Sequence, residues 1–190
     1  MARTREFDDA TVVRAAREAF WDHGYVSTSL AQLQAATGLS KSSLYETYGS
    51  KRGLFERAAR NYISEVMDPL LGPLEADGAG QAELVEYFLG LGRLVHATTS
   101  DVASRGCLMV TTVMELDELD AEAAELTGTF RQRIRAAVLH ALESIDSIDD
   151  REAKADVLTA GQLGLVVTSR MNAAAAAALA ETIAADIRRW

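Results

Sequence analysis

Apolar residues recur along this chain at intervals of three and four residues, which is the repeat of one face of an α-helix. Val13, Ala16 and Phe20 follow this spacing in a segment predicted to be helical from about residue 9 to residue 23. A second apolar stripe predicts a helix after residue 80 and consists of Leu84, Tyr87, Phe88, Leu91 and Val95. Strand signals are absent, so the pattern predicts an all-α protein of about nine helices.

Residues 28 to 55 predict two short helices joined by a tight turn. Ser29 and Gln32 have the spacing of a capping box that starts a helix, and Gly38 stands where that helix should end. Ser40 then starts the second helix as its N-cap. Such a helix-turn-helix holds its two helices at a fixed angle, so the second can enter a DNA major groove while the first crosses the backbone.

The second helix of this pair, from about residue 41 to residue 48, presents a polar face. Leu44 and Tyr48 fall on one side of it and must face the protein. The other positions are Lys41, Ser42, Ser43, Tyr45, Glu46 and Thr47. Hydroxyls and a helix N-terminus suit base edges and phosphates. A carboxylate such as Glu46 is repelled by phosphates unless it accepts a hydrogen bond from the amino group of cytosine. Each residue taken alone is better explained as an ordinary solvated position, but together in this frame they indicate DNA binding.

The remaining helices are predicted over about residues 51–71, 106–116, 120–145, 149–171 and 173–189. Pro69 and Pro73 are expected to end the first of them, because proline lacks the amide hydrogen that continues a helix. A loop rich in Gly and Ala is expected around residues 77 to 80. The helix that starts at residue 51 begins beside the DNA and ends in the body, which makes it the expected mechanical link between the two.

The last two predicted helices are rich in small residues, including Ala160, Gly161, Gly164 and the six alanines at 173–178. Small side chains let helix axes approach closely, as a self-complementary four-helix interface requires. A low-complexity helix without a partner explains the alanine run equally well, so the pattern alone leaves a homodimer open.

Charge divides the chain in the same way as the helix pattern. Residues 1 to 60 carry nine Lys or Arg and seven Asp or Glu, whereas residues 61 to 190 carry ten and twenty-one. The net charge of −9 therefore allows a local DNA-binding face, while the acidic body repels DNA elsewhere. Arg3 and Arg5 suit either a minor-groove arm or a disordered start.

The sequence gives little support to an enzyme. His23, His96 and His140 are the only histidines, and neither a zinc-protease nor a serine-hydrolase motif is present. No catalytic residue, metal or cofactor is expected. A single cysteine rules out an internal disulfide framework, and without a signal-peptide core or a membrane-spanning stretch we expect a cytoplasmic protein.

Residues 11 to 62 resemble the DNA-binding domain of the TetR/AcrR family of transcriptional repressors. The resemblance rests on Phe20, Gly24-Tyr25, Thr28-Ser29, Thr37-Gly38-Leu39-Ser40-Lys41, Leu44-Tyr45, Ser50-Lys51 and Leu54-Phe55. It implies a helix-turn-helix domain over residues 1–50 and a ligand-binding and dimerisation domain over residues 51–190. The implied protein is a homodimer through its last two helices that binds double-stranded, near-palindromic operator DNA and is released by a small-molecule inducer.

Carried onto this chain, the family's DNA contacts fall on Ser29, Leu30, Lys41, Ser42, Ser43, Tyr45, Thr47 and Lys51. Members often have glycine where this chain has Ser42, and a polar residue where it has Leu30. The remaining alternatives are a regulator that responds to a protein partner and one that activates transcription.

An inducer pocket of mixed apolar and polar character would draw on the body helices. The candidate lining is Phe88, Leu91, Cys107, Val110, Thr111, Met114, Phe130, Ile134 and Leu165, each of which suits ordinary core as well. Cys107 is interpreted as a buried small residue, with oxidant sensing as the alternative. His96 suits either a polar ligand contact or a structural histidine.

Overall fold

The computed structural model describes residues 8–96, 105–119 and 121–190, and every regular element within them is a helix. This confirms the all-α prediction. The α-helices are α1 (Asp9–His23), α2 (Leu30–Thr37), α3 (Lys41–Tyr48), α4 (Lys51–Tyr62), α5 (Asp68–Glu75), α6 (Gln81–His96), α8 (Leu108–Val113), α9 (Ala121–Glu143), α10 (Arg151–Met171) and α11 (Ala173–Ile187). A π-helical turn, Ile63–Met67, joins α4 to α5, and a 3-10 turn, Leu116–Glu118, follows α8.

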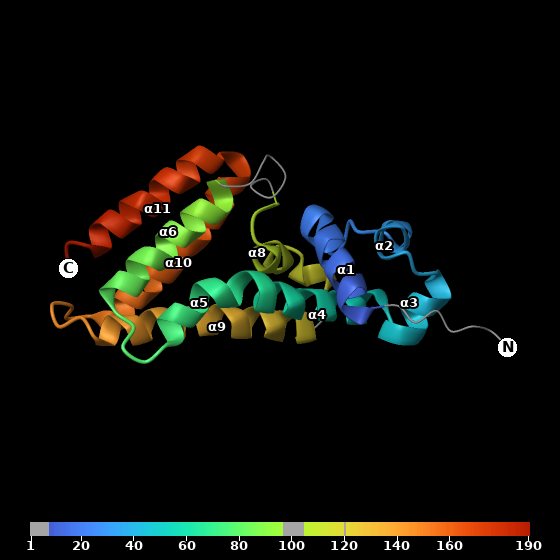
Figure 1. The fold of residues 1–190 in the computed structure, drawn as a ribbon, viewed down its shortest axis with the longest axis horizontal. Coiled ribbons are helices and arrows are strands. Elements are labelled where there is room, and N and C mark those ends of the chain that lie inside the picture. Colours follow the sequence, from blue (N-terminus) through green and yellow to red (C-terminus); the bar gives the residue numbers. More distant parts are fainter. Residues whose placement is uncertain (1–7, 97–104, 120) are drawn as a thin grey trace.

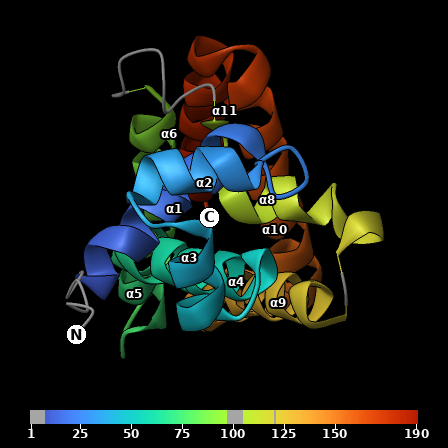
Figure 2. The same cartoon turned by 90° about the vertical axis from the view of Figure 1, so that its right-hand side faces the viewer.

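The molecule is elongated, with α1, α2 and α3 at one end and α6, α10 and α11 at the other (Figures 1 and 2). We call the described part of residues 8–62, which holds α1 to α4, the head and that of residues 68–190 the body. The run from α4 through the π-helical turn to α5 leads from the head into the body, and α5 packs beside α9. α11 lies along α6 and α10, so the C-terminal helix is an integral part of the body.

Side-chain caps define the helices of the head. Asp8, Ser29, Ser40 and Ser50 each accept a hydrogen bond from the backbone amide three residues later and so satisfy a free donor at the start of α1, α2, α3 and α4. The predicted bounds of α1, residues 9 to 23, are those observed. The α2–α3 turn contains Gly38 at φ +70°, a left-handed conformation that glycine adopts without a steric penalty.

The predicted end of the fourth helix near Leu71 is wrong, because the helical run continues to Glu75. Pro69 lies in the first turn of α5, where a missing amide hydrogen is tolerated. Pro73 stands inside α5, and the helix continues past it with Leu71 and Leu74 fully buried on the core side. The packing of these two leucines offsets the hydrogen bond that Pro73 removes.

The helix predicted over residues 106–116 is shorter than expected. Gly106 has φ +70°, which is incompatible with a right-handed helix, so α8 begins only at Leu108. The helix ends at Val113 and the chain continues through a turn into Leu116–Glu118. This break places Glu115 outside the helix and allows it to reach the head, as described below.

One continuous core runs through head and body. In the head, the ring of Phe55 packs edge-on against Phe20 and Tyr25, with centroid distances of 5.2 and 5.1 Å. Trp21 and Tyr62 pack edge-on at 4.8 Å and continue this core from α1 and α4 toward the body. None of the helices in the described ranges is long and apolar enough to cross a lipid bilayer.

Candidate DNA-binding face and ligand cavity

The α2–α3 turn is held by local hydrogen bonds. The Ser29 hydroxyl accepts from the amide of Gln32 at 3.2 Å, and the Gln32 side-chain oxygen accepts from the amide of Ser29 at 2.7 Å, which completes the predicted capping box. The Gly38 amide donates to the carbonyl of Gln34 at 2.9 Å. These bonds fix the direction in which α3 leaves the turn.

α3 has one buried side and one exposed side. Leu44 and Tyr48 are buried, and the Tyr48 hydroxyl donates to the Asp9 carboxylate at 2.7 Å, which ties α3 to the start of α1. Burial, followed by this hydrogen bond, raises the pKa of Tyr48. The exposed side chains on the rest of the helix are Lys41, Ser42, Tyr45, Glu46 and Thr47. Most of the predicted DNA contacts therefore share one solvent-facing surface, which we call the α3 face.

Five of the predicted contacts are engaged within the head. The Ser29 hydroxyl caps α2, and the Ser42 hydroxyl lies 2.9 Å from that of Ser40. Leu30 is half-buried against the core. Ser43 is half-buried, and its hydroxyl lies 2.9 Å from that of Ser40. The Lys51 ammonium donates to the carbonyl of Val26 at 3.4 Å and lies 4.4 Å from the centre of the Tyr25 ring. Desolvation lowers the pKa of Lys51, so this lysine is partly withdrawn from solvent, unlike Lys41.

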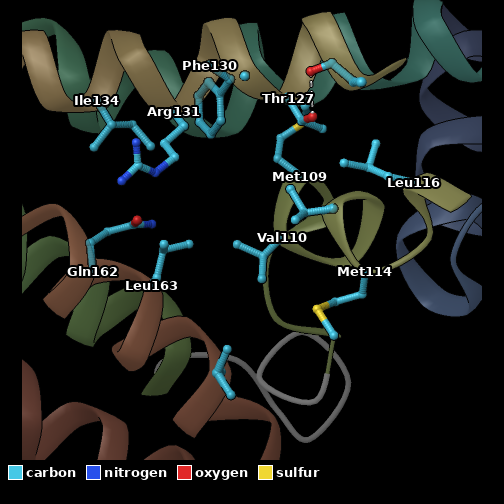
Figure 3. Close-up of a pocket in the computed structure, with 14 residues that line it drawn as sticks. Met109, Val110, Met114, Leu116, Thr127, Phe130, Arg131, Ile134, Gln162 and Leu163 are labelled. Carbon is cyan, nitrogen blue, oxygen red and sulfur yellow. Dashed lines mark hydrogen bonds between the residues drawn. The ribbon is translucent and has the colours of Figure 1, made fainter. Parts of the chain in front are cut away.

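A cavity of about 500 Å³ lies in the body between α8, α9 and α10 (Figure 3). A volume in this range is typical of small-molecule sites. Its walls are mostly aliphatic, with one aromatic ring and three polar side chains. The lining residues are Met109, Val110, Val113, Met114, Leu116, Ala124, Thr127, Gly128, Phe130, Arg131, Ile134, Gln162, Leu163 and Val167.

Four residues of the predicted lining, Val110, Met114, Phe130 and Ile134, surround this cavity. The others lie elsewhere: Phe88 and Leu165 are fully buried core, and Thr111 accepts a hydrogen bond from Arg170 at 3.2 Å. Leu91 and Cys107 line a separate void of about 20 Å³, with room for about one water molecule.

Sequence reasoning missed the polar side chains of the cavity. Thr127, Arg131 and Ile134 follow helical spacing along one side of α9, so the prediction of Ile134 carried a signal for the other two. Gln162, on α10, stands three residues before the predicted Leu165, so the same spacing placed it on the inner side of its helix.

Cys107 is 4% exposed, and burial raises the pKa of its thiol. A raised pKa disfavours the thiolate, which is the form that reacts with oxidants. The environment therefore agrees with the interpretation of Cys107 as a packing residue. The side chain of His96 lies outside the described residues, and among the residues described no three His, Cys, Asp or Glu side chains gather as a metal site requires.

Residues 105–116, which include part of the cavity wall, also hold the head. The Gly106 carbonyl accepts from the indole nitrogen of Trp21 at 2.9 Å, and Arg105 forms ion pairs with Glu18 and Asp22 on α1. At the other end of the segment, the Glu115 carboxylate accepts from the amide of Tyr25 at 2.7 Å. We call these contacts of Arg105, Gly106 and Glu115 the clasp.

The clasp approaches the head closely at the loop between α1 and α2. Gly24 has φ +78°, and a side-chain carbon there would overlap the carboxylate of Glu115. The neighbouring residues Met114 and Leu116 both line the cavity. A change in the shape of the cavity that moves Met114 or Leu116 would therefore also move Glu115, which accepts the hydrogen bond from the Tyr25 amide of the head. The expectation that α4 is the mechanical link is incomplete, because the clasp forms a second connection.

Comparison with known proteins relates the head to bacterial regulators. The family model described as "Bacterial regulatory proteins, tetR family" matches residues 12–58. The uncharacterized HTH-type transcriptional regulator YezE of Bacillus subtilis (strain 168) is 31% identical over 142 residues, which are 75% of this chain and 72% of YezE. The HTH-type transcriptional repressor ComR of Escherichia coli (strain K12) is 28% identical over 69% of this chain and 60% of its own length.

Among solved structures, the chain is similar to a cysteine mutant of the TetR family transcriptional regulator CifR in complex with 26-bp double-strand operator DNA. The two are 29% identical, with a TM-score of 0.71, over 99% of this chain and 100% of the other. The similarity therefore extends from the head through the body.

Proposed function

Since this chain belongs to the TetR family of bacterial transcriptional regulators, we propose that it represses transcription by binding a near-palindromic operator as a homodimer and that a small molecule releases it. The α3 face carries this proposal, because it presents hydroxyls, a phenol, a cation and a carboxylate on a helix whose direction is fixed by a capped turn. Two similar proteins support the proposal: ComR is described as a transcriptional repressor, and the CifR structure contains operator DNA.

In the proposed complex, α3 lies in the major groove and α2 crosses the backbone. Lys41 stands in the first turn of α3, where an ammonium group and free backbone amides both suit a phosphate. Ser42, Tyr45 and Thr47 offer hydroxyls, and Glu46 offers an acceptor for a cytosine amino group. Ser43 and Lys51 are held within the head, so we assign them to positioning of the helices that face the DNA.

The proposed dimer interface is an apolar stripe on α10. Val157 is 67% exposed and Met171 is 77% exposed, and between them Ala160, Gly164 and Val167 are also exposed. The intervals of three and four residues place all five along one side of the helix. A continuous apolar stripe on a soluble protein marks an interaction surface, and small residues at its centre allow a second helix to approach closely. Exposed alanines of α11, among them Ala174 and Ala178, extend the surface.

The position of the cavity supports the proposed release by a ligand. A molecule that fills the space beside Met114 and Leu116 acts on the segment that ends in the clasp. A ligand that binds more tightly to a conformation with a different spacing between the heads of the two protomers favours that conformation. It then shifts the population away from the operator-bound form.

Replacing Lys41 with alanine tests the proposed docking of α3. The variant should bind all DNA sequences more weakly, and the slope of log K against log salt should fall by about one unit, because one phosphate contact is lost. Fluorescence anisotropy with a selected operator at several salt concentrations measures both quantities.

Lys154→Ala is the matched control, since it removes the same charge from α10, where the ammonium lies 4.3 Å from the centre of the Trp190 ring. Its salt slope should equal that of the parent protein. Equal slopes for Lys41→Ala and the parent would remove α3 from the proposed DNA interface.

A further inference from the structure

We propose that the cavity between α8, α9 and α10 binds a monocarboxylate with an apolar body, and that Arg131 and Gln162 hold the carboxylate. This inference rests on the proposed function, because it names the chemical class of the releasing ligand. It is carried by two polar side chains that line the cavity and make no hydrogen bond or ion pair with the described residues.

Arg131 differs from the two arginines that follow it on α9. Arg133 pairs with Asp68 and Glu75, both at 2.6 Å. Arg135 pairs with Glu152 and Asp156, also both at 2.6 Å. Arg131 is exposed and makes no ion pair or hydrogen bond in the described part of the chain. Its charge acts on Asp156 at longer range: the pKa of Asp156 is lowered first by the hydrogen bond from Arg135 and also by the charge of Arg131. Its guanidinium instead borders the cavity.

Gln162 supplies the second observation. Its side chain belongs to a residue that is only 2% exposed, yet its amide makes no hydrogen bond with any described group. The amide atoms are not enclosed by protein but open onto the cavity, where water or a ligand can supply the hydrogen bonds that amides ordinarily make. Figure 3 shows the Gln162 amide and the Arg131 guanidinium directed toward one another from α10 and α9 across the cavity. A ligand group between them would receive hydrogen bonds from both.

A carboxylate matches this pair of donors. The planar guanidinium donates two parallel hydrogen bonds to a carboxylate, and the Gln162 amide nitrogen provides a further donor. A doubly charged phosphate would require more positive charge than one arginine supplies. A cationic ligand would face Arg131 without a compensating carboxylate, since no Asp or Glu is among the lining residues.

The rest of the cavity suits an apolar body. Apart from Thr127, whose hydroxyl donates to the carbonyls of Ala123 and Ala124, the remaining lining side chains are apolar. Figure 3 shows Met114 and Leu116 beyond Val110, away from Arg131 and Gln162. A ligand anchored by its carboxylate would thus direct its apolar end toward the residues that flank Glu115.

Calorimetry with octanoate, 1-octanol and octylamine tests the proposal, because these probes share an apolar chain and differ in the charge of the head group. The full-length protein should bind octanoate at least about tenfold more tightly than 1-octanol, in line with the strength of hydrogen bonds to charged groups, and octylamine most weakly. Arg131→Gln should remove the preference for octanoate while leaving the affinity for 1-octanol within about twofold. Arg131→Lys should retain part of the preference through its point charge.

Arg60→Gln is the matched control, since Arg60 is an exposed arginine of α4 outside this cavity, and it should bind octanoate like the parent protein. Operator binding without any probe, measured on the same preparations, should be unchanged in all three variants. Equal affinity for octanoate and 1-octanol, a preference that survives Arg131→Gln, or no binding of any probe by protein that binds operator would overturn the carboxylate proposal. Failure of the parent protein to bind DNA would instead contradict the proposed function.

Discussion

Replacing Ala160 with arginine is expected to convert the protein into a monomer and to weaken operator binding by at least about a hundredfold. Ala160 lies in the middle of the exposed stripe of α10, so an arginine there places a large charge where the second copy is proposed to pack. A dimer binds its second half-site as an intramolecular event, and the loss of that advantage is commonly about 10² to 10⁴ in affinity. Sedimentation and fluorescence anisotropy measure the two effects.

Ala136→Arg serves as the control, because Ala136 is an exposed alanine of α9 that does not belong to the stripe. It should sediment like the parent protein and bind operator with the parent's affinity. Removal of α11 would be a poorer test, because it would also expose the core. Its residues Ala176, Ala180, Ala184 and Ile187 are buried against the body. An intact dimer in Ala160→Arg would relocate the interface away from α10.

The second large effect is expected from Glu115→Ala, which removes the acceptor of the Tyr25 amide. If the clasp transmits the presence of ligand to the head, this variant should lose most of the coupling between ligand and operator. Coupling of this kind is commonly about 1–3 kcal/mol, which corresponds to about a 5- to 150-fold change in operator affinity on ligand binding. In Glu115→Ala, ligand should change the operator affinity by only about twofold. Its affinity for ligand alone should change little, because Glu115 does not line the cavity.

Glu115→Gln is the matched control, since its amide oxygen can still accept the hydrogen bond from Tyr25 and should preserve most of the coupling. The measurement is the operator affinity with and without saturating ligand, together with the ligand affinity with and without operator. The two ratios must agree within each variant. Full coupling in Glu115→Ala would assign transmission to α4 instead.

The helices of the head were predictable because their boundaries are encoded locally. Ser29 and Gln32 form a capping box within four residues, and Gly38 ends α2 by its own backbone preference. Contacts of this kind depend on neighbours in the sequence and leave a recognisable pattern. The outward side of α3 followed for the same reason, since Leu44 and Tyr48 fix its rotation about the helix axis.

The clasp was not predictable, because it depends on contacts between residues far apart in the sequence. Glu115 meets Tyr25 across 90 positions, and Trp21 meets Gly106 across 85. The apolar spacing around residues 106–116 indicated a helix, and only the positive φ of Gly106 and the bond from Trp21 show why the helix begins later.

The cavity was predictable in part, because apolar residues on body helices supply either core or lining. Phe88 and Leu165 lie in the core, whereas Phe130 and Ile134 line the cavity. Which residues line the cavity depends on how closely α8, α9 and α10 approach one another. The partners of the arginines on α9 come from α5 and α10. Without those elements in place, the sequence does not reveal that Arg131 is left unpaired among the described residues.

Operator binding by a homodimer is tested most directly by selecting bound duplexes from random DNA with the whole chain, residues 1–190. We expect enrichment of a near-palindrome that is bound by two protomers. Its half-sites should be centred about one helical turn apart, roughly 34 to 36 Å, because the two copies of α3 are proposed to lie in successive major grooves. Recovery of no common sequence, or of a single asymmetric site bound by one protomer, would contradict operator binding by a homodimer.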